Sequence, residues 1–535
     1  MKFSSAFIAL SAACLVAAAP SSNVARWGGD DGDDGRWNGE SGRDGSRDGS
    51  DRGMSCTGAP VSATSSHAAA THGASKTAST TVSSETRGAS TRATASAPAS
   101  TSKASGGKSA SSTKTKTSSG AASSSTSLAS SSSDLTDGTN PDVVGTAYFI
   151  TNDPTENNIV LANIGKDGNV TFAGLVSAGG KGVHGDDGGQ FASDATYSNG
   201  IIVVSESNNF LATTNTESAT VALFKIDPND PTKLEMAGEP VSSQGDFPTS
   251  VAFNHAGDRL CVMNSGTKAS LLCYGVSASG LSTQQETLRD LTIYGYNQTN
   301  PPQGPINTFS QVQFTEDDKN VVVALKGFIT PAPTRGALFV YPLSDNGELA
   351  KEPTIAGTPA PGGFTFSLTP IPEKNAFFSA DFSSGINVWD FNEGIESINS
   401  TKSKTNAAYV DGEITTCWST WAPTVDRYFL SDPSTCLVTE VSIDPDTLVP
   451  TVVANHTLVE GGENIDIAAA TIDNTDYLYA NLATGVGIAV LRLDGPGQST
   501  LVGVANMTEP VTSAGATITP NYIQGMAIYM KRNKD

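Results

Sequence analysis

The residues best able to do chemistry recur at one position of a repeated strand–turn–strand unit. Seven copies end their second strand in a polar residue, and the charged ones are Glu206, Lys326, Asp381 and Asp432. Arg335 follows in the loop after Lys326. Lys326 and Arg335 could clamp a carboxylate in an anionic or polyol ligand, and the carboxylates could instead hold a hard cation. The alternative is that these polar residues only cap loops and solvate a channel.

Further candidates lie in the connections between units, which we expect to converge on the same mouth. Three of them are acidic: Asp246, Glu463 and Asp466. His184, in the glycine-rich segment GVHGDDGGQ, is the histidine candidate for acid–base work. His255, in the turn NHAGD, is expected on the opposite face as a structural residue, and His456, inside the sequon NHT, is expected at the surface.

The repeat that positions these residues has four strands, here A to D from first to last. The A–B hairpin is clear in FPTSVAFNHAGDRLCVMNS and NTFSQVQFTEDDKNVVVALKG, and a C–D hairpin such as ALFVYPLSDNGELAKEP follows each copy. Seven units of about 50–60 residues predict an all-β, seven-bladed β-propeller of four-stranded antiparallel blades. The last residues of the seven B strands are expected to be Asn152, Glu206, Asn264, Lys326, Asp381, Asp432 and Asn481.

The first unit lacks strand A, and the chain ends with one unpaired strand, NYIQGMAIYM, at 521–530. Pairing that strand with the segment beginning near Gly145 would complete blade one and remove two open sheet edges. A solenoid or two sandwiches are the alternative arrangements.

Composition divides the chain into four parts. Residues 1–18 resemble a secretory signal peptide, with an N-terminal membrane anchor as the alternative. Residues 19–53 are rich in Gly, Asp and Arg, and residues 54–140 in Ser, Thr and Ala; both are expected to be disordered, because they have too few large apolar residues to form a core. The second is either an O-glycosylated stalk or an unmodified spacer. Residues 141–535 are expected to form the propeller.

The net charge of −22, from 32 basic and 54 acidic residues, disfavours nucleic acid as a partner. No stretch after the signal approaches a transmembrane span. We therefore expect a secreted protein, extracellular or in the cell wall, and no cofactor.

Four cysteines fall within the propeller. Cys261 and Cys273 are equally spaced about a turn between strands B and C, which favours a disulfide. Cys417 and Cys436 are predicted on strands A and C, too far apart for a bond unless the loop between strands B and C folds back. No metal-type spacing of cysteines exists, so no metal site is predicted. Five sequons could carry N-linked glycans: Asn169, Asn297, Asn399, Asn455 and Asn506.

The segment PTSVAFNHAGDRLCVMN resembles the A–B unit of lactonase-type seven-bladed propellers, and about 141–530 shares their layout. That group contains 6-phosphogluconolactonase, and the whole arrangement is similar to secreted fungal proteins named carboxymuconate cyclase-like. The resemblance implies a His-x-His signature and an Asp-Leu-Gly sequence in one blade. Here Thr308 and Ser310 stand at the histidine positions, and Leu325-Lys326-Gly327 replaces the second motif.

A hydroxyl cannot replace an imidazole as an acid or base near neutral pH. The leading hypothesis is therefore a secreted, glycosylated binding scaffold whose partner is an anionic or carbohydrate-like small molecule or a cell-wall or host surface. The alternative is an enzyme that forms or hydrolyses a lactone with His184, or with a carboxylate together with Lys326 and Arg335.

Overall fold

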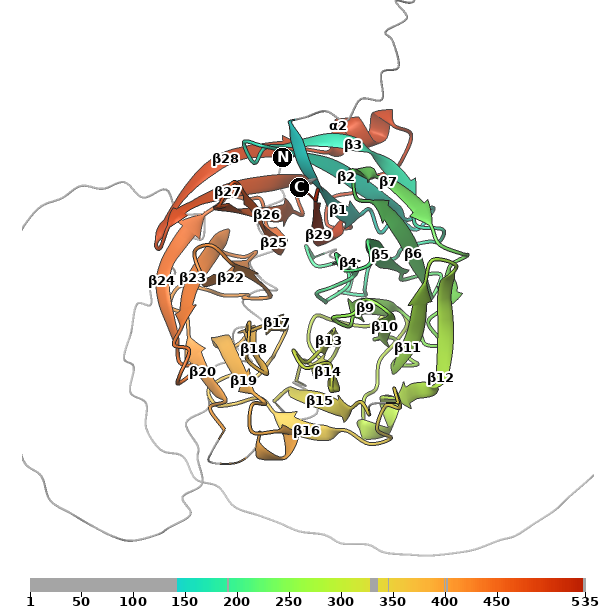
Figure 1. Cartoon of the computed structure of the whole chain (residues 1–535), viewed down its shortest axis with the longest axis vertical. Coiled ribbons are helices and arrows are strands. Elements are labelled where there is room, and N and C mark those ends of the chain that lie inside the picture. Colours follow the sequence, from blue (N-terminus) through green and yellow to red (C-terminus); the bar gives the residue numbers. More distant parts are fainter. Residues whose placement is uncertain are drawn as a thin grey trace, which may run out of the picture. The chain divides into compact units, whose positions relative to one another are not determined.

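The computed structural model describes residues 142–189, 192–327, 335–344, 346–398, 400 and 403–532. The predicted signal peptide and both segments up to residue 140 lie outside the described residues, as does Asn399. The described chain forms seven antiparallel sheets arranged as blades around a channel (Figure 1). This confirms the predicted seven-bladed propeller.

The blades follow one another along the chain, and strands A to D run outward from the channel in each. Blade one has β29 (Gln524–Met530), β1 (Val143–Ile150), β2 (Asn158–Gly165) and β3 (Val170–Ser177). Blade two has β4 (Ile202–Ser205), β5 (Phe210–Asn215), β6 (Thr220–Asp227) and β7 (Asp230–Met236), with β8 (Val241–Ser242) also paired to β6. Blade three has β9 (Pro248–Phe253), β10 (Arg259–Asn264), β11 (Ser270–Ser277) and β12 (Gly280–Asp290). Blade four has β13 (Phe309–Phe314), β14 (Asn320–Leu325), β15 (Ala337–Pro342) and β16 (Thr354–Gly357).

The remaining three blades have the same plan. Blade five has β17 (Thr369–Pro370), β18 (Ala376–Asp381), β19 (Gly385–Asp390) and β20 (Asn406–Tyr409). Blade six has β21 (Trp418–Ala422), β22 (Arg427–Asp432), β23 (Leu437–Ile443) and β24 (Pro450–Thr457). Blade seven has β25 (Asn464–Ile472), β26 (Thr475–Leu482), β27 (Gly487–Gly495) and β28 (Gln498–Asn506). Among the described residues, three short helices lie in the connections: η1 (Thr292–Tyr294) between blades three and four, η2 (Ile395–Ser397) within blade five, and α2 (Thr508–Ser513) before β29.

The C-terminal strand closes the ring as predicted. β29 pairs antiparallel with β1, with Met530 opposite Gly145 and Gln524 opposite Ile150. Gly145 is required there, because a Cβ at this position would lie 2.7 Å from the Met530 sulfur and 2.9 Å from the Tyr529 carbonyl oxygen. Closure buries the middle strands between neighbouring sheets, so that all six residues of β14 are buried.

Blade two is the one unit in which the predicted strand register is wrong. Its innermost strand is β4, so Glu206 lies in the turn after strand A, and Asn215 ends strand B. The preceding segment, expected to be strand A, does not join this sheet. Glu206 therefore lies at the opposite end of the channel from the polar ring.

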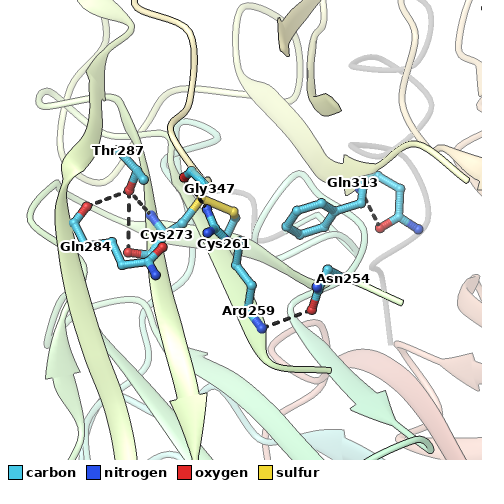
Figure 2. The surroundings of a disulfide bond; sticks show 9 residues. Asn254, Arg259, Cys261, Cys273, Gln284, Thr287, Gln313 and Gly347 are labelled. Carbon is cyan, nitrogen blue, oxygen red and sulfur yellow. Dashed lines mark hydrogen bonds between the residues drawn. A yellow bond between two sulfur atoms is a disulfide. The ribbon is translucent and has the colours of Figure 1, made fainter. Parts of the chain in front are cut away.

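A disulfide joins the two central strands of blade three (Figure 2). Cys261 in β10 and Cys273 in β11 are directly opposite in the register, with their Cα atoms 4.0 Å apart. The hydroxyl oxygen of Thr287 accepts a hydrogen bond from the Cys273 amide at 2.8 Å. Cys417 and Cys436 are buried free thiols.

Replacing both bonded cysteines, Cys261→Ser with Cys273→Ser, should lower the free energy of unfolding by about 2–3 kcal/mol, because the bond constrains the unfolded chain. Denaturant unfolding of the oxidised parent and the variant measures this. Reducing the parent should produce the same loss. Cys436→Ser, which keeps the disulfide, should depend on reductant as the parent does, whereas the double variant should show no dependence on reductant. Equal stability of parent and double variant would contradict the prediction.

Candidate functional site

The ends of the seven B strands form a polar ring at one mouth of the channel, as predicted. Its corrected members are Asn152, Asn215, Asn264, Lys326, Asp381, Asp432 and Asn481. All seven are buried, with exposed fractions of 0–1%. A ring so deeply buried is part of the framework of the propeller rather than a solvated rim.

Six of these side chains hold the backbone of the loops around them. The Asn264 amide donates to the Ser243 carbonyl at 3.1 Å, and the Asn215 amide donates to the Ala178 carbonyl at 2.9 Å. Asp381 accepts from the Gly363 and Phe364 amides at 3.0 and 2.9 Å. The geometry thus favours the loop-capping interpretation for the two ring carboxylates.

Asp432 caps its blade in the same way. Its carboxylate accepts hydrogen bonds from the Thr415 and Ser434 amides, each at 2.9 Å, and from the Thr415 hydroxyl at 2.8 Å. Neighbouring Glu413 is desolvated and faces Asp432, so its pKa is raised to about 7.

The segment Ala192–Gly200, here the channel segment, fills the space inside the ring. The Ser198 hydroxyl donates to the Thr249 carbonyl of blade three at 2.7 Å. The Trp418 indole of blade six donates to the Ser198 carbonyl at 3.1 Å, and the Gln524 carboxamide oxygen of blade one accepts from the Ala195 amide at 3.0 Å. A stretch bonded to innermost strands on opposite sides must lie across the channel.

Lys326 is the ring member that departs from the capping pattern. Its ammonium donates to the carbonyl oxygen of Tyr197 in the channel segment and lies 4.4 Å from the centroid of the Phe366 ring. Burial lowers the pKa of Lys326 to about 8, and the nearby carboxyl of Asp194 partly opposes that shift. The predicted ligand clamp is therefore occupied by the protein's own backbone.

Three desolvated carboxyl groups lie in or beside the channel segment: Asp194 belongs to it, and the buried Asp466 and half-buried Glu463 lie beside it. Desolvation raises the pKa of Asp194 to about 6, of Glu463 to about 7 and of Asp466 to about 8. Asp466 accepts from the Gly525 amide and the Gln524 carboxamide, each at 2.8 Å. One oxygen of each carboxyl has no hydrogen-bond partner among the described residues. Such perturbed groups are typical of functional sites but also of buried structural networks.

The other predicted residues lie apart from Lys326 or at the edge of the channel segment: Arg335 and Asp246 bond to other loops, and His184 contacts Ala192. The exposed Arg335 donates to the Thr358 and Pro361 carbonyls at 3.5 and 3.2 Å, so it does not share a partner with Lys326. Asp246 accepts from the Lys268 amide at 3.1 Å. The buried His184 ring lies 2.8 and 2.9 Å from the Gly185 and Ala192 carbonyl oxygens.

Sequence reasoning missed Asp194, Tyr197 and the role of Trp418, whose buried indole holds the channel segment. A signal was present: QFASDATYSNG lacks the alternating β-branched residues of a true strand A such as PTSVAF. The prediction for His456 is also wrong. It is 7% exposed, because its ring packs between blades six and seven rather than pointing to solvent with its sequon.

A hollow of about 470 Å³ opens on the other face, among the A–B turns. Its lining includes the rings of Phe253 and Phe314 and the polar residues Glu206, Gln313 and His255. Asp318, also in the lining, accepts the His255 amide at 3.0 Å. Sequence analysis placed His255 on this face but predicted no site there.

The described residues contain no group of three or more His, Cys, Asp or Glu arranged to hold a metal ion. Among their helices, none has the length and apolar character needed to cross a membrane.

The chain is similar to several solved structures at low identity. The periplasmic gluconolactonase of Pseudomonas aeruginosa is 13% identical with a TM-score of 0.48, covering 68% of this chain and 96% of that one. A protein named as a candidate 6-phosphogluconolactonase from Bacteroides fragilis is 12% identical with a TM-score of 0.47, covering 68% and 95%. A functionally unknown protein from Desulfotomaculum acetoxidans is 11% identical with a TM-score of 0.48, covering 72% and 98%. No activity follows from them. No protein-family model and no curated protein matches the chain.

Asp466→Asn should remove part of the pH dependence of folding. Burial raises the pKa of Asp466 from 3.8 to about 8, so the folded protein holds this proton more tightly than the unfolded chain between those values. Raising the pH across that window therefore lowers the free energy of unfolding. Above pH 8 the variant should be more stable than the parent by on the order of 2 kcal/mol.

The measurement is denaturant unfolding from pH 5 to pH 9. Asp473→Asn, at an exposed position in the turn between β25 and β26, is the matched control and should leave the slope unchanged. If the free energy of unfolding of Asp466→Asn changed with pH as steeply as that of the parent, the raised pKa of Asp466 would be refuted.

Proposed function

We propose that the chain is a secreted, N-glycosylated propeller that binds a carbohydrate-like ligand without turning it over. The observation that carries this proposal is the channel segment. Its Tyr197 carbonyl accepts a hydrogen bond from the Lys326 ammonium, the group that the sequence analysis assigned to holding the carboxylate of a ligand. A buried lysine whose ammonium already donates to a backbone carbonyl is not free to bind an anion.

The positions where the resemblance implies histidines support the same conclusion. The Thr308 hydroxyl donates to the Pro305 carbonyl at 2.7 Å. Ser310 is fully buried, and its hydroxyl contacts the Thr365 carbonyl at 3.3 Å. Neither hydroxyl exchanges a proton usefully near neutral pH, which supports a blade without the acid–base chemistry that the resemblance implies.

The hollow among the A–B turns is the better ligand site. Its lining has carboxylates and amides but no lysine or arginine, which disfavours an anionic ligand. The half-buried Phe253 ring, combined with the amide and hydroxyl groups of the lining, suits a neutral sugar. This places the proposed site at the opposite end of the channel from the polar ring.

The glycans are proposed from sequons whose asparagines lie at the surface. The exposed positions are Asn169, Asn297, Asn455 and Asn506. None of them lines the hollow.

A lactone-forming or lactone-hydrolysing enzyme is the second candidate, and one observation favours it. The carboxyls of Asp194 and Asp466 and the ammonium of Lys326 are buried together with perturbed pKa values, a pattern common in active sites. Such an enzyme would have to displace the channel segment before substrate reached Lys326.

Lactone assays separate the two candidates. The full-length protein should hydrolyse sugar lactones and muconate lactones no faster than buffer. Turnover that is lost in Lys326→Ala or Arg335→Ala, while circular dichroism shows an intact fold, would establish the enzyme instead.

Binding of neutral oligosaccharides tests the hollow directly. Gln313→Ala should weaken binding up to about tenfold, the effect of one lost hydrogen bond. Ile293→Ala, at an exposed position outside the hollow, should bind like the parent. Isothermal titration with neutral and acidic sugars provides the measurement, and tighter binding of the acidic sugars would contradict the proposed ligand class.

A further inference from the structure

A serine, a histidine and a carboxylate are linked in a row at the junction of blades six and seven. The Ser499 hydroxyl oxygen lies 2.9 Å from His456 Nδ1, and His456 Nε2 lies 3.0 Å from Glu440 Oε2. The three residues come from three strands, β28, β24 and β23. The arrangement therefore depends on the packing of blade seven against blade six.

The surroundings of Glu440 determine which nitrogen of His456 carries the hydrogen, and so which group donates in each of the two hydrogen bonds. Its buried carboxylate accepts the Gly497 amide at 2.9 Å and lies 3.6 Å from the Arg427 guanidinium. A carboxylate held by an amide and a cation is an acceptor, so the imidazole carries its hydrogen on Nε2, facing Glu440. The lone pair on Nδ1 then faces Ser499 and accepts its hydroxyl hydrogen.

This polarity is that of an activated nucleophile: a hydroxyl, a base that takes its proton, and a carboxylate that orients the base. In the Ser–His–Asp proteases the hydroxyl meets Nε2 and the carboxylate meets Nδ1. Here the two nitrogens exchange places. Because either imidazole nitrogen can accept a proton, the exchange preserves the chemistry.

Solvent access differs along the row in the way that a nucleophile requires. The side chains of Glu440 and His456 are 2% and 6% exposed, whereas Ser499 is half-buried at the outer edge of its blade. The surface nearby includes two exposed apolar side chains. Leu501, two residues along β28, is 45% exposed, and Val453, which is 39% exposed, lies next to Gly497.

We propose that Ser499 is an acylatable serine, with His456 as its base and Glu440 as the positioning residue, and that the site takes esters with an apolar acyl group. This proposal is independent of the ligand-binding function, because the junction of blades six and seven contributes nothing to the hollow.

The reaction balances with residues of this chain and water alone. Nδ1 takes the hydroxyl proton while the serine oxygen bonds to the acyl carbon. The imidazolium returns that proton to the leaving alkoxide as its bond to carbon breaks. Water, deprotonated in the same way, then releases the acid from the serine. General-base assistance of this kind contributes about 10²–10⁴-fold.

Labelling by a fluorophosphonate tests the proposal on the unaltered full-length protein. Peptide mapping should find the adduct on Ser499, at a rate at least a hundredfold above that of Ser442. Ser442 is the internal control, because it is also half-buried on a strand of blade six but its hydroxyl donates to the Thr451 carbonyl. Absence of an adduct on Ser499 in the folded protein overturns the proposal without any variant.

Two variants separate catalysis from structure. Ser499→Ala should abolish labelling, and His456→Gln, which preserves the sequon of Asn455, should slow it at least a hundredfold. Ester hydrolysis measured with short p-nitrophenyl esters should fall in parallel. Labelling of Ser499 that is unchanged in a folded His456→Gln protein would show that the imidazole has only a structural role.

Discussion

Closure of the ring is the constraint on which the rest of the structure depends. Each blade is a twisted sheet that is buried on both faces, so every blade needs two neighbours. The pairing of β29 with β1 supplies the last contact and joins the two ends of the described chain. Only a closed ring brings innermost strands from opposite sides to within hydrogen-bond reach of one segment.

Desolvation inside that ring explains the chemistry of the channel. An ammonium and several carboxyl groups are removed from water, and their pKa values shift toward the neutral forms. The channel segment compensates in part by offering backbone carbonyls and amides. Its Tyr197 carbonyl solvates Lys326, and its Ala195 amide holds the carboxamide that also bonds Asp466. The buried charges and the segment therefore stabilise each other.

The repeat made most of the fold predictable from the sequence, because strand alternation and turn residues recur at a fixed spacing. The ring positions of Lys326, Asp381 and Asp432 followed from that register. The predicted register of blade two was wrong because the segment before β4 lies in the channel and does not join the sheet. The ring position is therefore Asn215 rather than Glu206. No local pattern reports that Tyr197 meets Lys326 across 129 residues, since only closure brings them together.

The outer strands carry a consequence for how the molecule meets others. β24 and β28 are edge strands of their sheets, and Val452 and Val504 on them are exposed. Unpaired edges with apolar side chains invite strand addition from a second molecule. Asn455 and Asn506 lie on these same two strands. A sugar chain at either asparagine would stand between the edge and any approaching strand, discouraging sideways aggregation while leaving the faces at the two ends of the channel free.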